Sequence, residues 1–162
     1  MLSKGSGAYR TILQHISRLT ASSSAPQGIL IHCRAGRDRT ELPIYLLYSL
    51  LGMPEEMIAK EYVLSNEGLA PLLPEFKERA LATGAFDRPD GTKDLEALQR
   101  RMILSPDAMR LLVKLVKNEW ESPERYVRDV LGLSNQDIQN IRDTFVVKGV
   151  QGTSERPSGK NT

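Results

Sequence analysis

Apolar residues recur at helical spacing near the start of the chain, and then give way to a short continuous apolar run. The first pattern predicts an amphipathic helix over residues 8–20, with one face formed by Ile12, Leu13, Ile16 and Leu19. The Ser/Ala-rich segment 20–26 predicts a loop. The run Gly-Ile-Leu-Ile-His-Cys at 28–33 follows, and its aliphatic and β-branched residues predict a short buried strand.

The rest of the chain predicts helices. Residues 42–51 are apolar nearly all round, which indicates a buried helix with Pro43 in its first turn. Two more helices are expected over 56–65 and 71–83, before a turn-rich loop at 86–91. Capping serines then precede three helices, expected over 106–120, 123–131 and 135–145; they are Ser105, Ser122 and Ser134. The Gly/Ser/Pro-rich residues 149–162 predict a disordered tail.

One predicted strand beside six or seven helices is an unusual balance. A lone strand cannot satisfy its backbone hydrogen-bonding groups, so it requires neighbouring strands. The sequence offers no clear partner strand. We therefore expect an unpaired strand edge through which the chain self-associates.

Composition narrows the function classes. The 162 residues carry a net charge of +2, which does not argue for a nucleic-acid partner. One cysteine excludes an intramolecular disulfide, and two histidines leave a His/Cys metal site short of ligands. The longest nearly apolar run, 42–53, is too short to cross a bilayer as a helix. A cytoplasmic protein without a transmembrane segment is the expectation.

The segment His-Cys-Arg-Ala-Gly-Arg-Asp-Arg-Thr at 32–40 lies between the expected strand and the next helix. Its successive backbone N–H groups can converge on one anion, and the helix N-terminus adds its positive end. Gly36 permits the tight curl. Cys33 would lie beneath the anion, where the same field lowers the thiol pKa and favours the nucleophilic thiolate. Arg39, six positions later, can hold two phosphoryl oxygens with its planar guanidinium.

This arrangement resembles the protein tyrosine phosphatase superfamily, whose Cys-x5-Arg core is preceded by His and followed by Thr. The form His-Cys-x-Ala-Gly-[Lys/Arg]-Asp-Arg-Thr is similar to tyrosine/lipid phosphatases of bacterial and fungal type. The likeness continues through 46–66, Ser-Pro-Asp-Ala-Met from 105 and Tyr-Val-Arg-Asp-Val-Leu-Gly-Leu-Ser from 126. It implies an α/β phosphatase-type fold, with residues 1–148 as the C-terminal part of the domain, mostly helical with one P-loop strand.

The resemblance also implies roles for the motif residues. Cys33 would be the nucleophile that forms a cysteinyl-phosphate, and Arg39 would stabilise the transferring phosphoryl group. His32 would support the loop from beneath. The remaining phosphate-binding positions are Arg34, Ala35, Gly36, Arg37 and Thr40. No metal or other cofactor is expected, because arginine and backbone dipoles supply the positive charge.

Two features depart from the family pattern. Glu41 stands where members usually have glycine, so we expect reduced activity or shifted selectivity. Members also carry about a hundred residues before this strand, including the rest of the sheet and usually a loop with an aspartate general acid. The motif here begins at residue 32, so we expect a truncated domain. Asp38 is then the best candidate for the acid, the alternative being that it braces the loop or pairs with an arginine.

The resemblance implies hydrolysis of phosphomonoesters: phosphotyrosine in proteins first, phosphoinositides or phosphoserine/threonine second. Arg34 and Arg37 either suit multiply charged substrates or form a solvated basic loop. The competing interpretation is a truncated or pseudo-phosphatase that binds an anion without turnover. A rhodanese-type sulfurtransferase fits poorly, because the shorter spacing before its arginine lands here on Asp38.

Overall fold

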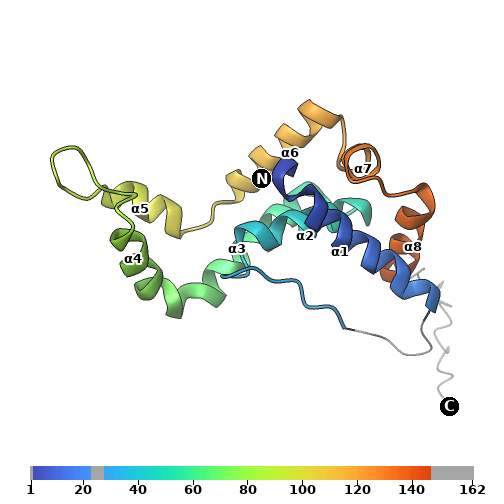
Figure 1. Ribbon diagram of the computed structural model, residues 1–162, viewed down its shortest axis with the longest axis horizontal. Helices are drawn as coiled ribbons and strands as arrows, with labels where there is room; N and C mark the ends of the chain where they lie inside the picture. Colours follow the sequence, from blue (N-terminus) through green and yellow to red (C-terminus); the bar gives the residue numbers. More distant parts are fainter. Residues whose placement is uncertain (1, 23–27, 147–162) are drawn as a thin grey trace, which may run out of the picture.

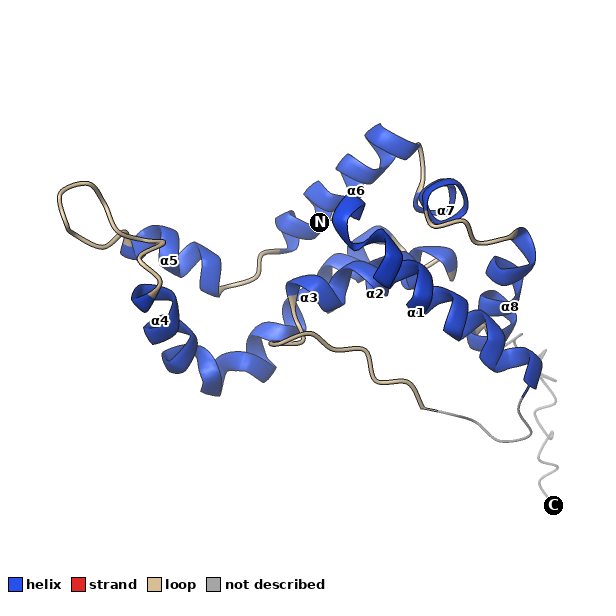
Figure 2. Ribbon diagram, viewed as in Figure 1, coloured by secondary structure: helices blue, strands red, loops and turns tan. Residues whose placement is uncertain are grey.

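The computed structural model describes residues 2–22 and 28–146, and this part of the chain is mostly helical (Figures 1 and 2). The elements are α1 (Leu2–Ser22), α2 (Asp38–Leu50), α3 (Glu55–Leu69), the 3₁₀ turn η1 (Ala70–Leu72), α4 (Leu73–Ala82), α5 (Leu95–Met102), α6 (Pro106–Trp120), α7 (Pro123–Arg125), the π-helical turn η2 (Tyr126–Val130) and α8 (Asn135–Phe145).

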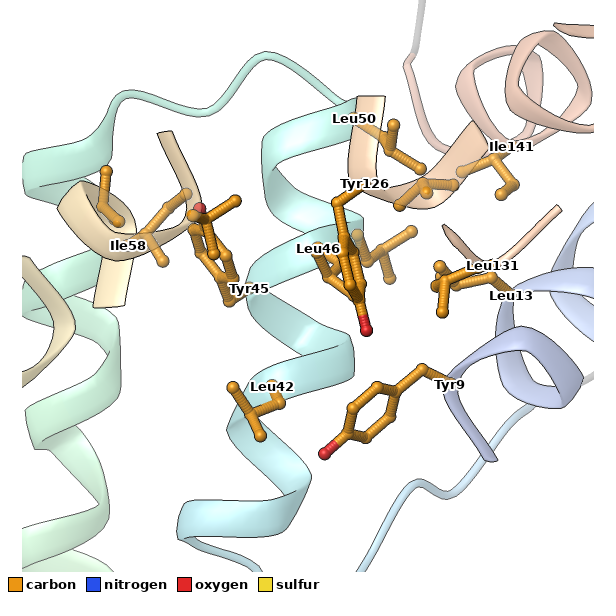
Figure 3. Packing of buried hydrophobic residues seen from close by; sticks show 14 of the residues in the cluster. Tyr9, Leu13, Leu42, Tyr45, Leu46, Leu50, Ile58, Tyr126, Leu131 and Ile141 are labelled. Carbon is orange, nitrogen blue, oxygen red and sulfur yellow. The ribbon is translucent and has the colours of Figure 1, made fainter. Parts of the chain in front are cut away.

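Helix α2 is the centre of the hydrophobic core. Most of its residues are buried, as expected for a helix that is apolar nearly all round. Figure 3 shows Leu42, Leu46 and Leu50 of α2 in one cluster with side chains of α1 and of the C-terminal helices, among them Tyr9 and Tyr126. α1 packs against both α2 and α8, and α3 packs against α6. The core thus holds α2 and the loop before it in a fixed frame.

Helices α4 and α5 pack against each other and extend away from the remaining helices as a separate arm (Figure 1). The loop between them is held by turn chemistry: the Asp90 carboxylate accepts hydrogen bonds from the amide (2.9 Å) and hydroxyl (2.7 Å) of Thr92. An isolated antiparallel bridge joins Asp87 and Lys93. The turn-rich loop predicted at 86–91 is confirmed.

The strand predicted at 28–33 is wrong for the described residues, which contain no strand at all. Residues 28–33 form an irregular segment without backbone hydrogen bonds to other described residues. The prediction of burial also fails, since the Leu30 side chain is 85% exposed. A strand needs a partner to form its ladder, and among the described residues none is present. The expected α/β arrangement is therefore seen here only as its helical component.

The helix predictions fare better, because they rest on local signals. The capping serines are confirmed: Ser105, Ser122 and Ser134 each accept a backbone N–H with the side-chain oxygen. The α6 and α8 bounds agree with prediction. Helix α2, however, begins at Asp38 rather than 42, so Pro43 lies inside the helix and not in its first turn. The acidic Asp38 and Glu41 extend the helix backward, since carboxylates favour its positive end.

Helix α5 was not predicted. The signals for it exist but are short: Asp94 caps it by accepting from the Ala97 amide at 2.9 Å, and Leu98 is its one buried residue. The predicted tail from 149 onward lies outside the described residues. Within the described part, no helix is both long and apolar enough to cross a membrane.

Candidate active site

The loop between Cys33 and Thr40 curls into the N-terminus of α2. Gly36 has a φ of +63°, a left-handed conformation that glycine adopts without steric penalty. The first helical bond of α2 joins the Glu41 amide to the Arg37 carbonyl oxygen at 2.8 Å. The loop lines a pocket of about 380 Å³, whose opposite wall comes from α4 and α5. This is the size of a small-molecule site and is larger than a phosphoryl group alone needs.

Cys33 lies partly buried at the start of this loop. Burial by itself raises the pKa of the thiol. The Thr40 side chain and the backbone amides of Arg37, Ala35 and Thr40 act in the opposite direction by donating to the sulfur, and the net result is a pKa lowered to about 6. The thiolate is therefore the main form at neutral pH, as a nucleophile requires.

The Thr40 hydroxyl is one of the groups that lower the pKa of the Cys33 thiol. Its Oγ1 is buried and has no other partner among the described residues. A buried hydroxyl without a partner is costly, so its position beside a sulfur anion is where it is best satisfied.

Arg34 and Arg39 present their side chains to the pocket. Both are exposed, and neither forms an ion pair with a described residue. Their charges are thus free to bind an anion above Cys33. Together with the loop amides, they give the pocket a strongly positive interior next to the nucleophile.

Arg37 has a different position. Its side chain is buried, and its Nη1 donates to the Met102 carbonyl oxygen at 3.0 Å while its Nη2 donates to the Arg101 carbonyl oxygen at 3.1 Å. It also pairs with Asp38 at 3.2 Å. The guanidinium fastens the loop to the end of α5. Only the backbone of Arg37 is left to meet a phosphate.

Asp38 lines the pocket and is at the same time the ion-pair partner of Arg37. The structure therefore realises the bracing role that the sequence left open. The same carboxylate also lines the pocket that contains Cys33. His32 is exposed, with its Nδ1 3.2 Å from the Cys33 carbonyl oxygen, so its supporting role stays a prediction.

Glu41 is buried, 8% exposed, directly after the motif. Burial is the main cause that raises its pKa to about 7, and the nearby charges of Glu61, Asp38 and Cys33 act in the same direction. It faces a second cavity of about 370 Å³, which Asp38 and Tyr62 also line. A raised pKa favours the neutral form of this carboxyl, and the neutral form does not repel an anion in the neighbouring loop.

Six pocket residues were not predicted from the sequence. They lie in α4, directly after it, and at the end of α5: Phe76, Arg79, Ala80, Thr83, Arg101 and Met102. Nothing in their local sequence marks them, because they reach Cys33 only through the packing of the arm. The described residues contain no cluster of three or more metal-ligating side chains.

Comparison with known proteins gives the site its context. The model of the tyrosine phosphatase family matches residues 1–147. A tyrosine-protein phosphatase of Cupriavidus necator is 27% identical over 119 residues, which cover 73% of this chain and 39% of the relative. A tyrosine-protein phosphatase of Nostoc commune is 28% identical over 114 residues, which cover 70% of this chain and 37% of that protein. No solved structure matches the chain significantly.

This chain thus spans under two fifths of the length of these curated relatives. The family match covers nearly the whole described part, including the loop with the activated cysteine. The chain belongs to the tyrosine phosphatase family.

Proposed function

We propose that this chain hydrolyses phosphomonoesters, with phosphotyrosine in proteins as the first substrate class, through Cys33 and Arg39. The observation that carries the proposal is the Cys33 thiol, whose pKa is lowered to about 6 by the donors of its own loop. The same donors suit the equatorial oxygens of a phosphoryl group. Membership of the tyrosine phosphatase family supports the substrate class.

The reaction takes two steps. The Cys33 thiolate attacks phosphorus, the S–P bond forms, and the P–O bond to the leaving group breaks while Asp38 supplies the proton to the departing oxygen. Water then attacks the cysteinyl-phosphate, the S–P bond breaks, and inorganic phosphate and the thiolate are released. Asp38 takes up the proton of the attacking water. Arg39 and the loop amides hold the phosphoryl oxygens in both steps.

Asp38 as acid competes with its pairing to Arg37. The carboxylate that would supply the proton is held 3.2 Å from the Arg37 guanidinium. Phosphoinositides and phosphoserine/threonine are secondary substrates under this proposal, supported by the free charge of Arg34. The absence of a second cysteine for a disulfide supports a cytoplasmic location.

A second candidate is an anion-binding module without turnover. The irregular segment 28–33 favours it, because Leu30 is exposed there and the backbone of the segment has no hydrogen-bond partner among the described residues. An exposed segment with an unpaired backbone also supports self-association of the chain. Under this second proposal the loop binds phosphate but does not support departure of the leaving group.

One experiment separates the two candidates. Phosphate release from para-nitrophenyl phosphate is measured for the full chain and for Cys33→Ser, and thermal unfolding of both is followed with and without vanadate. Turnover in the wild type that is lost in Cys33→Ser supports the enzyme. Vanadate protection without any turnover supports the binding module. Full turnover in Cys33→Ser overturns the mechanism.

A further inference from the structure

The pocket above Cys33 carries more positive charge than one phosphoryl group requires. Five arginines line it, and Asp38 is its single acidic residue in the described part of the chain. They come from the loop and from the arm: Arg34, Arg37, Arg39, Arg79 and Arg101. The chain as a whole has a net charge of only +2, so this concentration is local.

Two of the five are neutralised within the protein. Arg37 pairs with Asp38 and donates to the end of α5. Arg79 forms an ion pair of 2.7 Å with Glu75 one helical turn earlier. Arg34 and Arg39 belong to the loop, and the negative charge of a bound phosphoryl group would balance their positive charges. Arg101 is left over, with no acidic partner among the described residues.

Arg101 is held at the pocket by its backbone. Its carbonyl oxygen accepts from Nη2 of Arg37 at 3.1 Å, and the next carbonyl, that of Met102, accepts from Nη1 at 3.0 Å. This two-point bond fixes the last turn of α5 to the catalytic loop. The exposed Arg101 side chain is therefore held at the pocket that contains the nucleophile.

 Packing of the arm brings Arg101 and Cys33 into one pocket, although 68 positions separate them along the chain.

The wall between Arg101 and the loop is apolar. Phe76 and Ala80 of α4 and Met102 of α5 line the same pocket. An aromatic ring fits such a surface better than a polyhydroxylated ring, which would leave its hydroxyls without partners. The arrangement places an anion site, an apolar wall and a second, free cation in one pocket.

The geometry points to Arg101 as a specificity-determining residue that binds a second anionic group of the substrate, a carboxylate next to phosphotyrosine in an acidic peptide. This inference rests on the proposed function of the same pocket. The phosphoryl group lies over Cys33, the tyrosine ring lies against the apolar wall, and the neighbouring aspartate or glutamate pairs with Arg101. A charge-assisted hydrogen bond of this kind discriminates strongly against an uncharged neighbour.

The chain offers a matched control for the test. Arg100 is adjacent, also exposed, and forms an ion pair of 2.5 Å with Glu96; it does not line the Cys33 pocket. The variants are Arg101→Gln and Arg100→Gln in the full chain. Neither change removes the backbone carbonyl that Arg37 bonds. The substrates are two phosphotyrosine peptides that differ only in Asp or Asn after the phosphotyrosine.

The readout is the ratio of kcat/KM for the Asp peptide to that for the Asn peptide. We expect a ratio of about 10 for the wild type and Arg100→Gln at low salt, and a ratio near 1 for Arg101→Gln. Added salt should reduce the wild-type ratio, because the pair is exposed. An unchanged ratio in Arg101→Gln, with turnover intact, overturns the inference and leaves the proposed function standing.

A binding measurement separates the two proposals. The Kd values of both peptides are measured by fluorescence anisotropy on Cys33→Ser and on Cys33→Ser combined with Arg101→Gln. An Asp preference that Arg101→Gln removes supports the inference even if the wild type shows no turnover. Loss of affinity in the double variant for inositol bisphosphate, without any change in peptide preference, overturns it in favour of a phosphorylated headgroup. Absence of peptide binding to either protein also overturns it.

Discussion

The side-chain amide of Asn66 makes two hydrogen bonds to the backbone of a single residue, Leu104. Its Nδ2 donates to the Leu104 carbonyl oxygen at 2.9 Å, and its Oδ1 accepts from the Leu104 amide at 2.8 Å. The pair joins α3 to the connection between α5 and α6, where Leu104 itself is buried. It is thus the second fastening of the arm, beside the bonds from Arg37 to the end of α5.

Replacing Asn66 by alanine should destabilise the protein by about 1–3 kcal/mol, because both buried backbone groups of Leu104 lose their partner. Urea unfolding followed by circular dichroism measures the change. Asn140→Ala is the control, since the Asn140 side chain bonds Gln136 on the exposed surface of α8. Equal stability of the two variants would show that the Asn66 bonds are replaced by water.

Thr40→Val should raise the Cys33 pKa from about 6 toward the ordinary value of 9.0, since the hydroxyl donor to the thiolate is lost. The rate of alkylation by iodoacetamide against pH reports this pKa directly, because the thiolate is the reacting form. Valine keeps the branched shape of threonine, so packing changes little. Thr144→Val, on the exposed side of α8, should leave the profile unchanged. A profile that does not move in Thr40→Val would assign the lowered pKa to the backbone amides alone.

Much of the fold and the heart of the site could be predicted because their signals are local. Ser134 and Asp137 form a complete capping box, and helix α8, which begins there, ends at Phe145 as predicted. Cys33 and Arg39 likewise stand within one short motif. The strand predicted at 28–33 is absent from the described residues, because a strand is stabilised by its neighbours and not by its own residues alone.

The pocket residues of the arm, in contrast, could not be predicted from the local sequence. Arg101 follows Arg100 in a short polar helix, and nothing in that sequence distinguishes one from the other. The difference arises from packing: Arg37 bonds the backbone at the end of α5, so one arginine faces the pocket and its neighbour pairs with Glu96. Glu41 is similar, because its burial follows from the tertiary structure rather than from its position after the motif.

Arg39→Lys should lower kcat/KM on an aryl phosphate by about 100-fold or more, because a single ammonium cannot reproduce the two-point hold of a guanidinium on the transferring phosphoryl group. Steady-state phosphate release measures the loss. Arg88→Lys is the control, since Arg88 pairs with Asp94 in the loop of the arm and does not line the pocket. Turnover of Arg39→Lys close to wild type would remove Arg39 from the proposed mechanism.

Glu41→Gln should stabilise the protein in alkaline but not in acidic solution. In the wild type the native pKa of Glu41 is about 7, above the ordinary value of 4.5, mainly because the carboxyl is buried. Below pH 4.5 both the folded and the unfolded chain hold the proton, so the free energy of unfolding carries no penalty from this group. Between pH 4.5 and 7 the unfolded chain releases the proton first, and stability falls as the pH rises.

Above pH 7 the loss is complete and amounts to about 3 kcal/mol, since the two pKa values differ by about 2.5 units. Glutamine stays neutral throughout, so the stability difference between Glu41→Gln and wild type should grow from pH 4 to pH 8. Urea unfolding at both pH values measures it, with Glu67→Gln, on the exposed surface of α3, as the control. A difference that stays constant with pH would mean that Glu41 keeps an ordinary pKa. Its carboxylate would then stand fully charged beside the loop and oppose the binding of an anion at neutral pH.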